Sequence, residues 1–257
     1  MLTVQNVYDF MDGRAPFALQ EDFDNAGLLV GDPAWEVRGI HVALDVTSSV
    51  IDEAEALGAN LIVTHHPMMF SPRKRMTETD AEGQLMCRLI RNRMALIAAH
   101  TNLDRAPGGI NDVLAQVAGL TDVSGKGFVR VGSLPAPMTA KALADDLSRR
   151  LNTVVRLMGH EDTLIRRVGL CSGSGSEFWQ EAAAMGAQAF LTGEAKHHHA
   201  LEAAETGMVM LEAGHFATEA PGIFALADAL QIWPDAVQYG VCAVSYTHLT
   251  LPTTYTV

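Results

Sequence analysis

Leu61-Ile-Val-Thr-His-His-Pro-Met-Met-Phe70 is the most informative segment of the sequence. Its first four residues are apolar or β-branched and stop at two histidines and a proline, which predicts a short buried strand followed by a turn. Because the backbone turns where the strand ends, His65 and His66 can both face one place. Imidazole is the commonest protein ligand for metals such as zinc. The pair alone indicates either a metal site or an ordinary strand end.

Outward from this stretch, strands alternate with helices in both halves of the chain. Strands are predicted at residues 39–44, 61–64, 94–99, 152–158, 167–171, 187–192 and 208–211, and the helices between the first of them at 50–57, 81–92 and 108–118. Alternation of this kind predicts an α/β fold of βαβ units, with a mostly parallel sheet that helices cover on both faces.

Length and composition limit the number of domains that the chain can form. The 257 residues can form one large domain or two modest ones. Residues 121–137 are rich in Gly, Ser and Pro and mark the best candidate for a boundary. We therefore expect an N-terminal α/β domain at 1–125 and a second α/β segment at 126–240.

Charge and cysteine content exclude several classes of function. The net charge of −12 disfavours a sequence-independent grip on nucleic acid, which depends on basic side chains at phosphates. The three cysteines are widely spaced and form no CxxC pair, which is typical of a reduced cytoplasmic protein. No segment approaches the roughly 18 apolar residues of a membrane helix. We expect a soluble cytoplasmic protein without a membrane or nucleic-acid partner.

The tail at residues 241–257 differs from the rest of the chain. It contains no charged residue, and five of its last eleven residues are threonine. One interpretation is an edge strand with a disordered terminus. The interpretation that we favour is a non-native tail that replaces the original C-terminus through a frameshift or an assembly artefact.

Three predicted strands are each followed by residues of metal-ligating type. Residues 61–64 precede His65 and His66, residues 94–99 precede His100 and Asp104, and residues 208–211 precede His215 and Glu219. The carboxyl ends of strands in open α/β sheets are where ligands collect. We therefore expect these distant segments to meet at one metal site.

The number of candidate ligands indicates what kind of site this would be. His65, His66, Asp104, His215 and Glu219 supply three nitrogens and two carboxylates. A single ion needs three or four of these, whereas five suit two ions held ~3.5–4 Å apart. A nitrogen and oxygen set without sulfur permits zinc, iron, manganese or nickel.

Several segments together resemble a known family. The motifs are Asp24-Asn-Ala-Gly-Leu-Leu-Val-Gly31, Thr64-His-His-Pro67, His100-Thr-Asn-Leu-Asp104, Gly109-Ile-Asn-Asp112, Thr192-Gly-Glu194 and Gly214-His-Phe-Ala-Thr-Glu219. In this order they resemble the GTP cyclohydrolase 1 type 2 family, also called Nif-three-like dinuclear metal-centre proteins. The tail does not fit the resemblance.

The resemblance implies two linked α/β domains with a two-metal site in the cleft between them, and a ring-shaped homohexamer. The first domain would supply His65, His66 and Asp104, and the second His215 and Glu219, with Asp104 or Glu219 bridging. We expect two divalent ions per subunit, zinc, iron or manganese.

Further residues are candidates for the same site. His100 is expected to act in catalysis or to orient a ligand, and His198, within three consecutive histidines, to line the substrate pocket as a second catalytic residue. Asp24 and Asn25 are expected to bind substrate, or else to form a turn that enters a strand. The run Ser172-Gly-Ser-Gly-Ser176 indicates either a phosphate-binding loop or a tight turn, and we favour the turn.

The resemblance implies a metal-dependent hydrolase that opens the ring of GTP and releases formate. No motif that reads guanine or cradles a triphosphate is evident. We expect the hydrolase to act on a small nucleotide-like substrate. Phosphoester hydrolysis, which two-metal sites also serve, is an alternative activity. A further alternative is a non-enzymatic metal-binding or regulatory hexamer.

Overall fold

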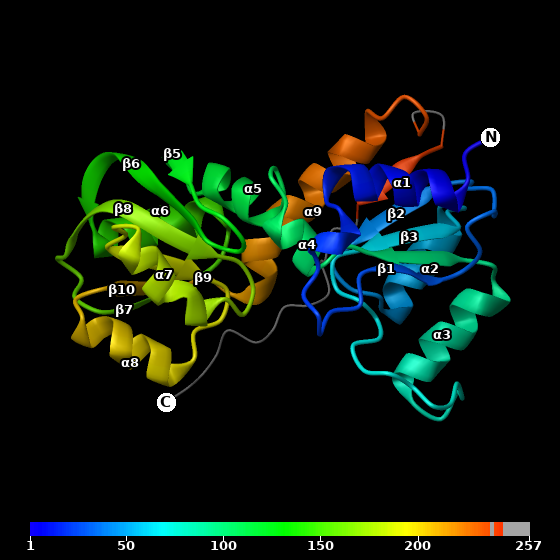
Figure 1. The fold of residues 1–257 in the computed structure, drawn as a ribbon, viewed down its shortest axis with the longest axis horizontal. Coiled ribbons are helices and arrows are strands. Elements are labelled where there is room, and N and C mark those ends of the chain that lie inside the picture. Colours follow the sequence, from blue (N-terminus) through cyan, green and yellow to red (C-terminus); the bar gives the residue numbers. More distant parts are fainter. Residues whose placement is uncertain (237–238, 244–257) are drawn as a thin grey trace.

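The computed structural model describes residues 1–236 and 239–243, and it arranges them around two β-sheets (Figure 1). The expected α/β fold of βαβ units is confirmed. The prediction of a non-native tail at 241–257 falls outside the described residues, except for the short strand at 241–243. Within the described part of the chain, no helix is long and apolar enough to span a membrane.

The first sheet has five strands in the order β1-β4-β3-β2-β11. Its elements are α1 (Val4–Arg14), η1 (Phe17–Leu19), β1 (Gly27–Val30), β2 (Ile40–Ala43), α2 (Ser48–Ala56), β3 (Leu61–Thr64), α3 (Ala81–Arg91), β4 (Ala95–Ala98) and, from the far end of the chain, β11 (Val241–Ala243). Strands β2, β3, β4 and β11 run parallel, and β1 pairs antiparallel with β4 at one edge.

Both faces of the first sheet are covered, because successive side chains of a strand point to opposite faces. Leu61 and Val63 of β3 pack in one cluster with residues of α1 and of the late helix α9 (His215–Gln231). Ile62 packs on the other face with residues of α2 and α3. All four residues of β3 are buried, which explains their continuous apolar run.

The second sheet has six strands in the order β5-β6-β8-β9-β10-β7. Its elements are β5 (Thr121–Ser124), β6 (Arg130–Thr139), α6 (Ala140–Arg150), β7 (Arg156–Met158), β8 (Leu164–Cys171), η2 (Ser176–Phe178), α7 (Trp179–Ala184), β9 (Ala189–Thr192), α8 (His197–Glu205) and β10 (Val209–Glu212). The central strands β8, β9 and β10 are parallel, whereas the pairs β5–β6, β6–β8 and β7–β10 are antiparallel.

Two segments have structure that the sequence did not predict. The Gly, Ser and Pro-rich stretch at 121–137, predicted to hold a domain boundary, forms most of β5 and β6 of the second sheet. Pro135 and Pro137 are exposed and lie where the pairing of β6 with β8 shifts register, which is where a strand tolerates proline. The helix predicted at 108–118 is preceded by a separate short helix, giving α4 (Thr101–Arg105) and α5 (Ile110–Val117).

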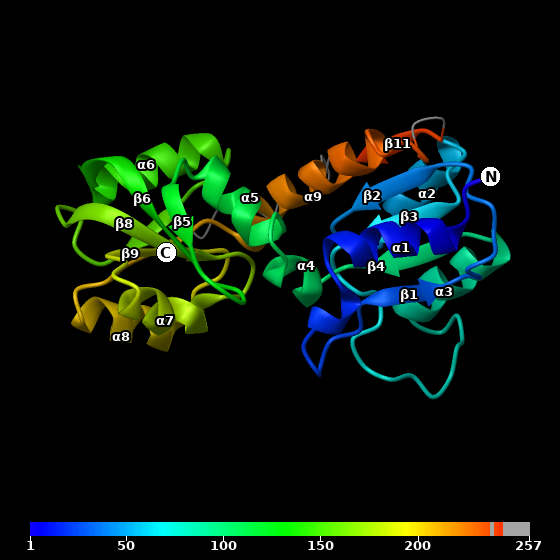
Figure 2. The ribbon, with the colours of Figure 1, turned by 45° about the horizontal axis from the view of Figure 1, so that its top comes forward.

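Helix α9 joins the two sheets. It begins after β10 of the second sheet, and its later residues Ile223 and Leu226 lie in the core of the first (Figure 2). Along the way it packs tightly on α5, since a Cβ placed on Gly222 would lie 2.5 Å from Cδ1 of Ile110. The second sheet is therefore inserted between elements that complete the first.

Candidate metal centre

The candidate ligands of the first sheet follow its parallel strands. His65 and His66 come directly after β3, and His100 comes two residues after the end of β4. Parallel neighbours end at the same edge of a sheet, so these imidazoles meet there. Asp104 follows on α4, one turn beyond His100. His215 and Glu219 stand one turn apart at the start of α9 and reach the same edge from the second sheet.

The orientation of His65, His66 and His100 is fixed through the Nδ1 atom of each ring. His65 Nδ1 donates to the carbonyl oxygen of Ala99 over 2.8 Å. His66 Nδ1 donates to Asp45 over 2.7 Å, and His100 Nδ1 to Asp24 over 2.8 Å. An imidazole that donates from Nδ1 presents the lone pair of Nε2, which is the form that binds a metal.

The same arrangement occurs in the second half of the site. His215 Nδ1 donates to Glu194 over 3.0 Å, while its Nε2 lies 3.1 Å from Glu219 Oε1. Glu194 is itself held by the hydroxyl of Ser174 at 2.6 Å. In all four imidazoles, an acceptor bonded to Nδ1 therefore fixes the ring and leaves Nε2 facing the site.

Glu219 lies between the two halves. Its Oε2 is 3.2 Å from His66 Nε2, and its Oε1 is 3.8 Å from His65 Nε2. Two overlapping groups of ligand atoms lie within 4.8 Å of one another: His65, His66 and His100, and His66, His215 and Glu219. The geometry thus divides the ligands into two sets that share His66.

Within the described residues, burial leaves three polar atoms of the site without a hydrogen-bond partner: His65 Nε2, Asp104 Oδ1 and Glu219 Oε2. His65 is fully buried and Asp104 is 8 % exposed. Their nearest atoms, Nε2 and Oδ1, lie 3.5 Å apart, and within the described residues neither has a hydrogen-bond partner. Unpaired buried polar atoms cost free energy. A cation coordinated by both would remove this cost, so the donor set fits a metal.

The protonation of the site follows from its crowding. Burial lowers the pKa of His65 to about 3, which keeps this ring neutral. Burial would also lower the pKa of His66, but hydrogen bonds to Asp45 and Glu219 outweigh burial and raise the pKa to about 10. Burial and the charge of Glu219 raise the pKa of Asp104 well above its usual range. Without a metal, His66 is therefore protonated and carries positive charge. A bound cation would take the place of this charge.

Burial opposes ionisation of Glu219 as well, yet its pKa is lowered. The raising effect of burial is exceeded by hydrogen bonds from His215 and His66. The pKa of His215 is raised through the same pair, against the lowering effect of burial. These opposite shifts describe a carboxylate that is held ionised by its neighbours.

The other predicted site residues have different surroundings. Both oxygens of Asp24 are engaged inside the protein, one by His100 Nδ1 and the other by the backbone N–H of Thr101 at 3.0 Å. Asn25 donates to the carbonyl oxygen of Met69 over 2.7 Å. Asp24 therefore orients His100, and a contact of either residue with substrate stays a prediction.

His198 lies exposed on α8, with its ring centroid 4.2 Å from that of His199. The structure gives it no contact with the ligands described above, and its catalytic role stays a prediction.

Asp45 and Glu194 are the site residues that the sequence analysis missed. Asp45 follows β2, and Glu194 follows β9, each two residues after the strand ends. The rule that found His65 and His100, polar residues behind a buried strand, applies to both.

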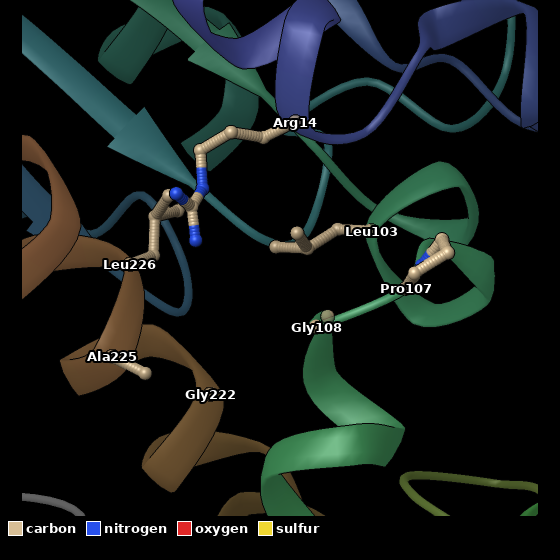
Figure 3. Close-up of a pocket in the computed structure, with 8 residues that line it drawn as sticks. Arg14, Leu103, Pro107, Gly108, Gly222, Ala225 and Leu226 are labelled. Atoms are coloured by element: carbon tan, nitrogen blue, oxygen red, sulfur yellow. The ribbon is translucent and has the colours of Figure 1, made fainter.

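A separate cavity of about 200 Å³ lies among residues of α1, α4 and α9 and of the loop after α4. It is lined by Arg14, Leu103, Pro107, Gly108, Gly109, Gly222, Ala225 and Leu226 (Figure 3). None of these residues is a candidate ligand, so this cavity is distinct from the metal centre.

Comparisons with known proteins agree with this architecture. The family model described as Duf34/NIF3 (NGG1p interacting factor 3) matches residues 2–248. A Clostridium acetobutylicum protein named GTP cyclohydrolase 1 type 2 homolog is 34 % identical over 241 residues, covering 90 % of each chain. A Streptomyces coelicolor protein of the same name is also 34 % identical, over 86 % of this chain and 83 % of its own.

A solved structure of a hypothetical protein from Staphylococcus aureus superposes with a TM-score of 0.90 at 28 % identity, covering 99 % of both chains. The family match spans nearly all of the chain and includes every candidate ligand described above. The chain therefore belongs to the Duf34/NIF3 family.

Proposed function

We propose that this protein binds two divalent metal ions, zinc, iron or manganese, and acts as a metal-dependent hydrolase. The observation that carries the proposal is the convergence of four imidazole Nε2 atoms and two carboxylates at one strand edge, with His65 Nε2 and Asp104 Oδ1 lacking any other partner within the described residues. Sites of this composition hold such ions in many hydrolases.

The ligands divide between the ions by proximity. His65, His100 and Asp104 would hold one ion, and His66 and His215 the other. Glu219 is the candidate bridge, because its two oxygens face His65 and His66 at 3.8 and 3.2 Å. Asp104 is the alternative bridge.

Two such ions would lower the pKa of bound water from ~15.7 towards ~7 and stabilise negative charge on a reacting oxygen. The protein orients the ligands through Ala99, Asp45, Asp24 and Glu194, and it excludes water from the buried His65. Proton transfer by His100, in place of metal binding, is the alternative role of this residue.

The substrate that we propose is a small nucleotide-like molecule, with GTP ring opening and formate release as the first reaction to test. The names of the relatives support this choice. Turnover of simple phosphoesters would instead support a two-metal phosphoesterase, and metal binding without turnover a non-enzymatic protein.

The decisive experiment is metal analysis followed by an assay. The purified chain, loaded with each metal in turn, should hold two ions, and His66→Ala should lose metal. His160→Ala is the matched control, since His160 is an exposed histidine whose side chain has no contact with the site. Loaded protein should then release formate from GTP. Two bound ions without formate would contradict this reaction, and metal content unchanged in His66→Ala would contradict the site.

We also propose a cytoplasmic homohexamer. Exposed apolar side chains on and after α9, such as Phe224 at 42 % and Ile232 at 77 % exposure, support a surface that a second subunit covers. Light scattering of the purified protein should give six times the chain mass, and a monomer would contradict the proposal.

A further inference from the structure

The turn Ser172–Ser174 follows β8 and lies against both halves of the metal centre. We propose that this turn sets the spacing between the two halves, and that Asn111, Gly173 and Ser174 are positioning residues for the ligands. The inference rests on the proposed two-metal site and concerns residues that bind neither metal nor substrate.

Asn111 joins the first half of the site to the turn. It is fully buried on α5, and its side-chain amide donates to the carbonyl oxygen of Asp104 over 3.1 Å. Its side-chain oxygen accepts the backbone N–H of Ser172 over 2.8 Å. One buried side chain therefore fixes the backbone of a first-half ligand relative to the turn of the second sheet.

Gly173 fixes the second half through its lack of a side chain. A Cβ at this position would lie 2.3 Å from Glu219 Oε1 and 3.2 Å from His215 Nε2. Its φ of +57° also lies in the left-handed region that favours glycine. The turn thus packs directly against two ligands, and no other residue fits there without moving them.

Two more bonds connect the turn to the second half. The backbone N–H of Gly173 donates to Thr218 Oγ1 over 3.1 Å, and Thr218 lies between His215 and Glu219 on α9. The hydroxyl of Ser174 donates to Glu194, which in turn accepts from His215 Nδ1.

Three consecutive residues therefore each hold a support of a different ligand. Ser172 is bonded to the support of Asp104, Gly173 to the helix turn that carries Glu219, and Ser174 to the support of His215. The turn is thus the connection through which the ligands of both sheets share one geometry.

The first test is Gly173→Ala against Gly127→Ala. Gly127 has a nearly equal φ of +60°, but a Cβ there meets nothing within 4 Å, so the control carries the same backbone strain without the clash. We expect Gly173→Ala to weaken manganese binding by roughly 10- to 100-fold, the usual effect of disturbing the supports of metal ligands. Gly127→Ala should keep wild-type affinity in chelator competition.

The second test is Asn111→Ala against Asn60→Ala. Asn60 is also a buried asparagine that bridges two backbone segments, through Arg38 N and the carbonyl oxygen of Glu36, but it has no contact with the ligands. Only Asn111→Ala should change the spin coupling between two bound Mn²⁺ ions, which depends on their spacing. Ser174→Ala removes a single exposed hydroxyl and keeps the test valid if Gly173→Ala does not fold.

The outcomes separate this inference from the proposed function. Weaker metal binding and altered coupling in the positioning variants alone would support it. Wild-type affinity and coupling in Gly173→Ala, Asn111→Ala and Ser174→Ala would overturn it while leaving the two-metal site intact. A wild-type protein that does not hold two ions would overturn the proposed function, and the inference with it.

Discussion

The two halves of the candidate metal centre are built in different ways. The first half places its ligands behind parallel strands, with His65 fully buried and its ring held by the backbone of Ala99. The second half places both ligands on one helix, and the side chain of His215 remains 32 % exposed. Each imidazole takes the acceptor on its Nδ1 from its own sheet, whereas Asn111 and the turn Ser172–Ser174 connect the two halves. This difference indicates that the site forms where two separately built halves meet, with Glu219 in contact with both.

The largest effect should come from removing Glu219, since it contacts both halves. Glu219→Ala is expected to abolish binding of both ions, because a bridging ligand cannot be replaced by either half alone. His100→Ala should remove only the ion held by His65, His100 and Asp104. Elemental analysis measures how much metal each variant retains. Equal metal loss in the two would contradict a bridging role of Glu219.

Truncation of each core tests whether the sheets unfold separately. Ile97 of the first core and Leu191 of the second are fully buried. Ile97→Ala and Leu191→Ala should each lower the free energy of unfolding by about 2–5 kcal/mol. In chelated protein we expect two unfolding transitions in calorimetry, with each variant shifting its own. A single transition that both variants shift equally would show that the sheets are not independent.

The carboxylates that orient the imidazoles should matter less than the ligands. Asp45→Asn replaces the charged acceptor of His66 Nδ1 with a neutral amide, and Glu194→Gln does the same for His215 Nδ1. Each should weaken metal binding by roughly 10- to 100-fold. The effect of Glu194→Gln should be the smaller, because His215 is more exposed than His66 and water can replace the lost acceptor. Chelator competition measures both affinities, and the reverse order would contradict this reasoning.

The smallest expected effects come from two matched helix caps. The hydroxyls of Thr47 and Thr139 each accept a backbone N–H over 3.2 Å, at the start of α2 and α6 respectively. Thr47→Ala and Thr139→Ala should each lower the free energy of unfolding by about 1 kcal/mol. The first should shift only the transition of the first sheet, and the second only that of the second.

Tryptophan fluorescence can distinguish the two transitions. Trp35 and Trp233 pack against the first core, whereas Trp179 lies in the second. In a Trp179→Phe background the fluorescence therefore reports the first sheet. A shift of this signal by Thr139→Ala in metal-free protein would contradict separate unfolding.

Much of the first sheet could be predicted from the sequence because its strands are buried on both faces and read as short apolar runs. The predicted strand at 61–64 coincides with β3, and the predicted helix at 50–57 overlaps α2. Two neighbouring strands of the second sheet were harder to predict. β5 is exposed along its whole length and β6 contains two prolines, so neither has an apolar pattern that identifies a strand.

The candidate ligands could be predicted for a similar reason, because each follows a recognisable strand or lies on a helix with spacing of four. Their supports could not. Asn111 acts through two hydrogen bonds to residues 7 and 61 positions away, and Gly173 acts through the space that it leaves empty. Such relations exist only once the two sheets have met, and no local pattern encodes them.

The insertion of the second sheet within the first has a consequence for synthesis of the chain. The core of the first sheet includes Ile223, Leu226 and Leu230 of α9, which leave the ribosome after the whole second sheet. Domains fold as units during synthesis. We expect the second sheet to fold first, at a stage when the core around His65 and His66 is still incomplete. Protease protection of stalled nascent chains would measure this order. The candidate metal centre would then be the last part of the molecule to form. Metal binding would therefore occur only after synthesis of α9.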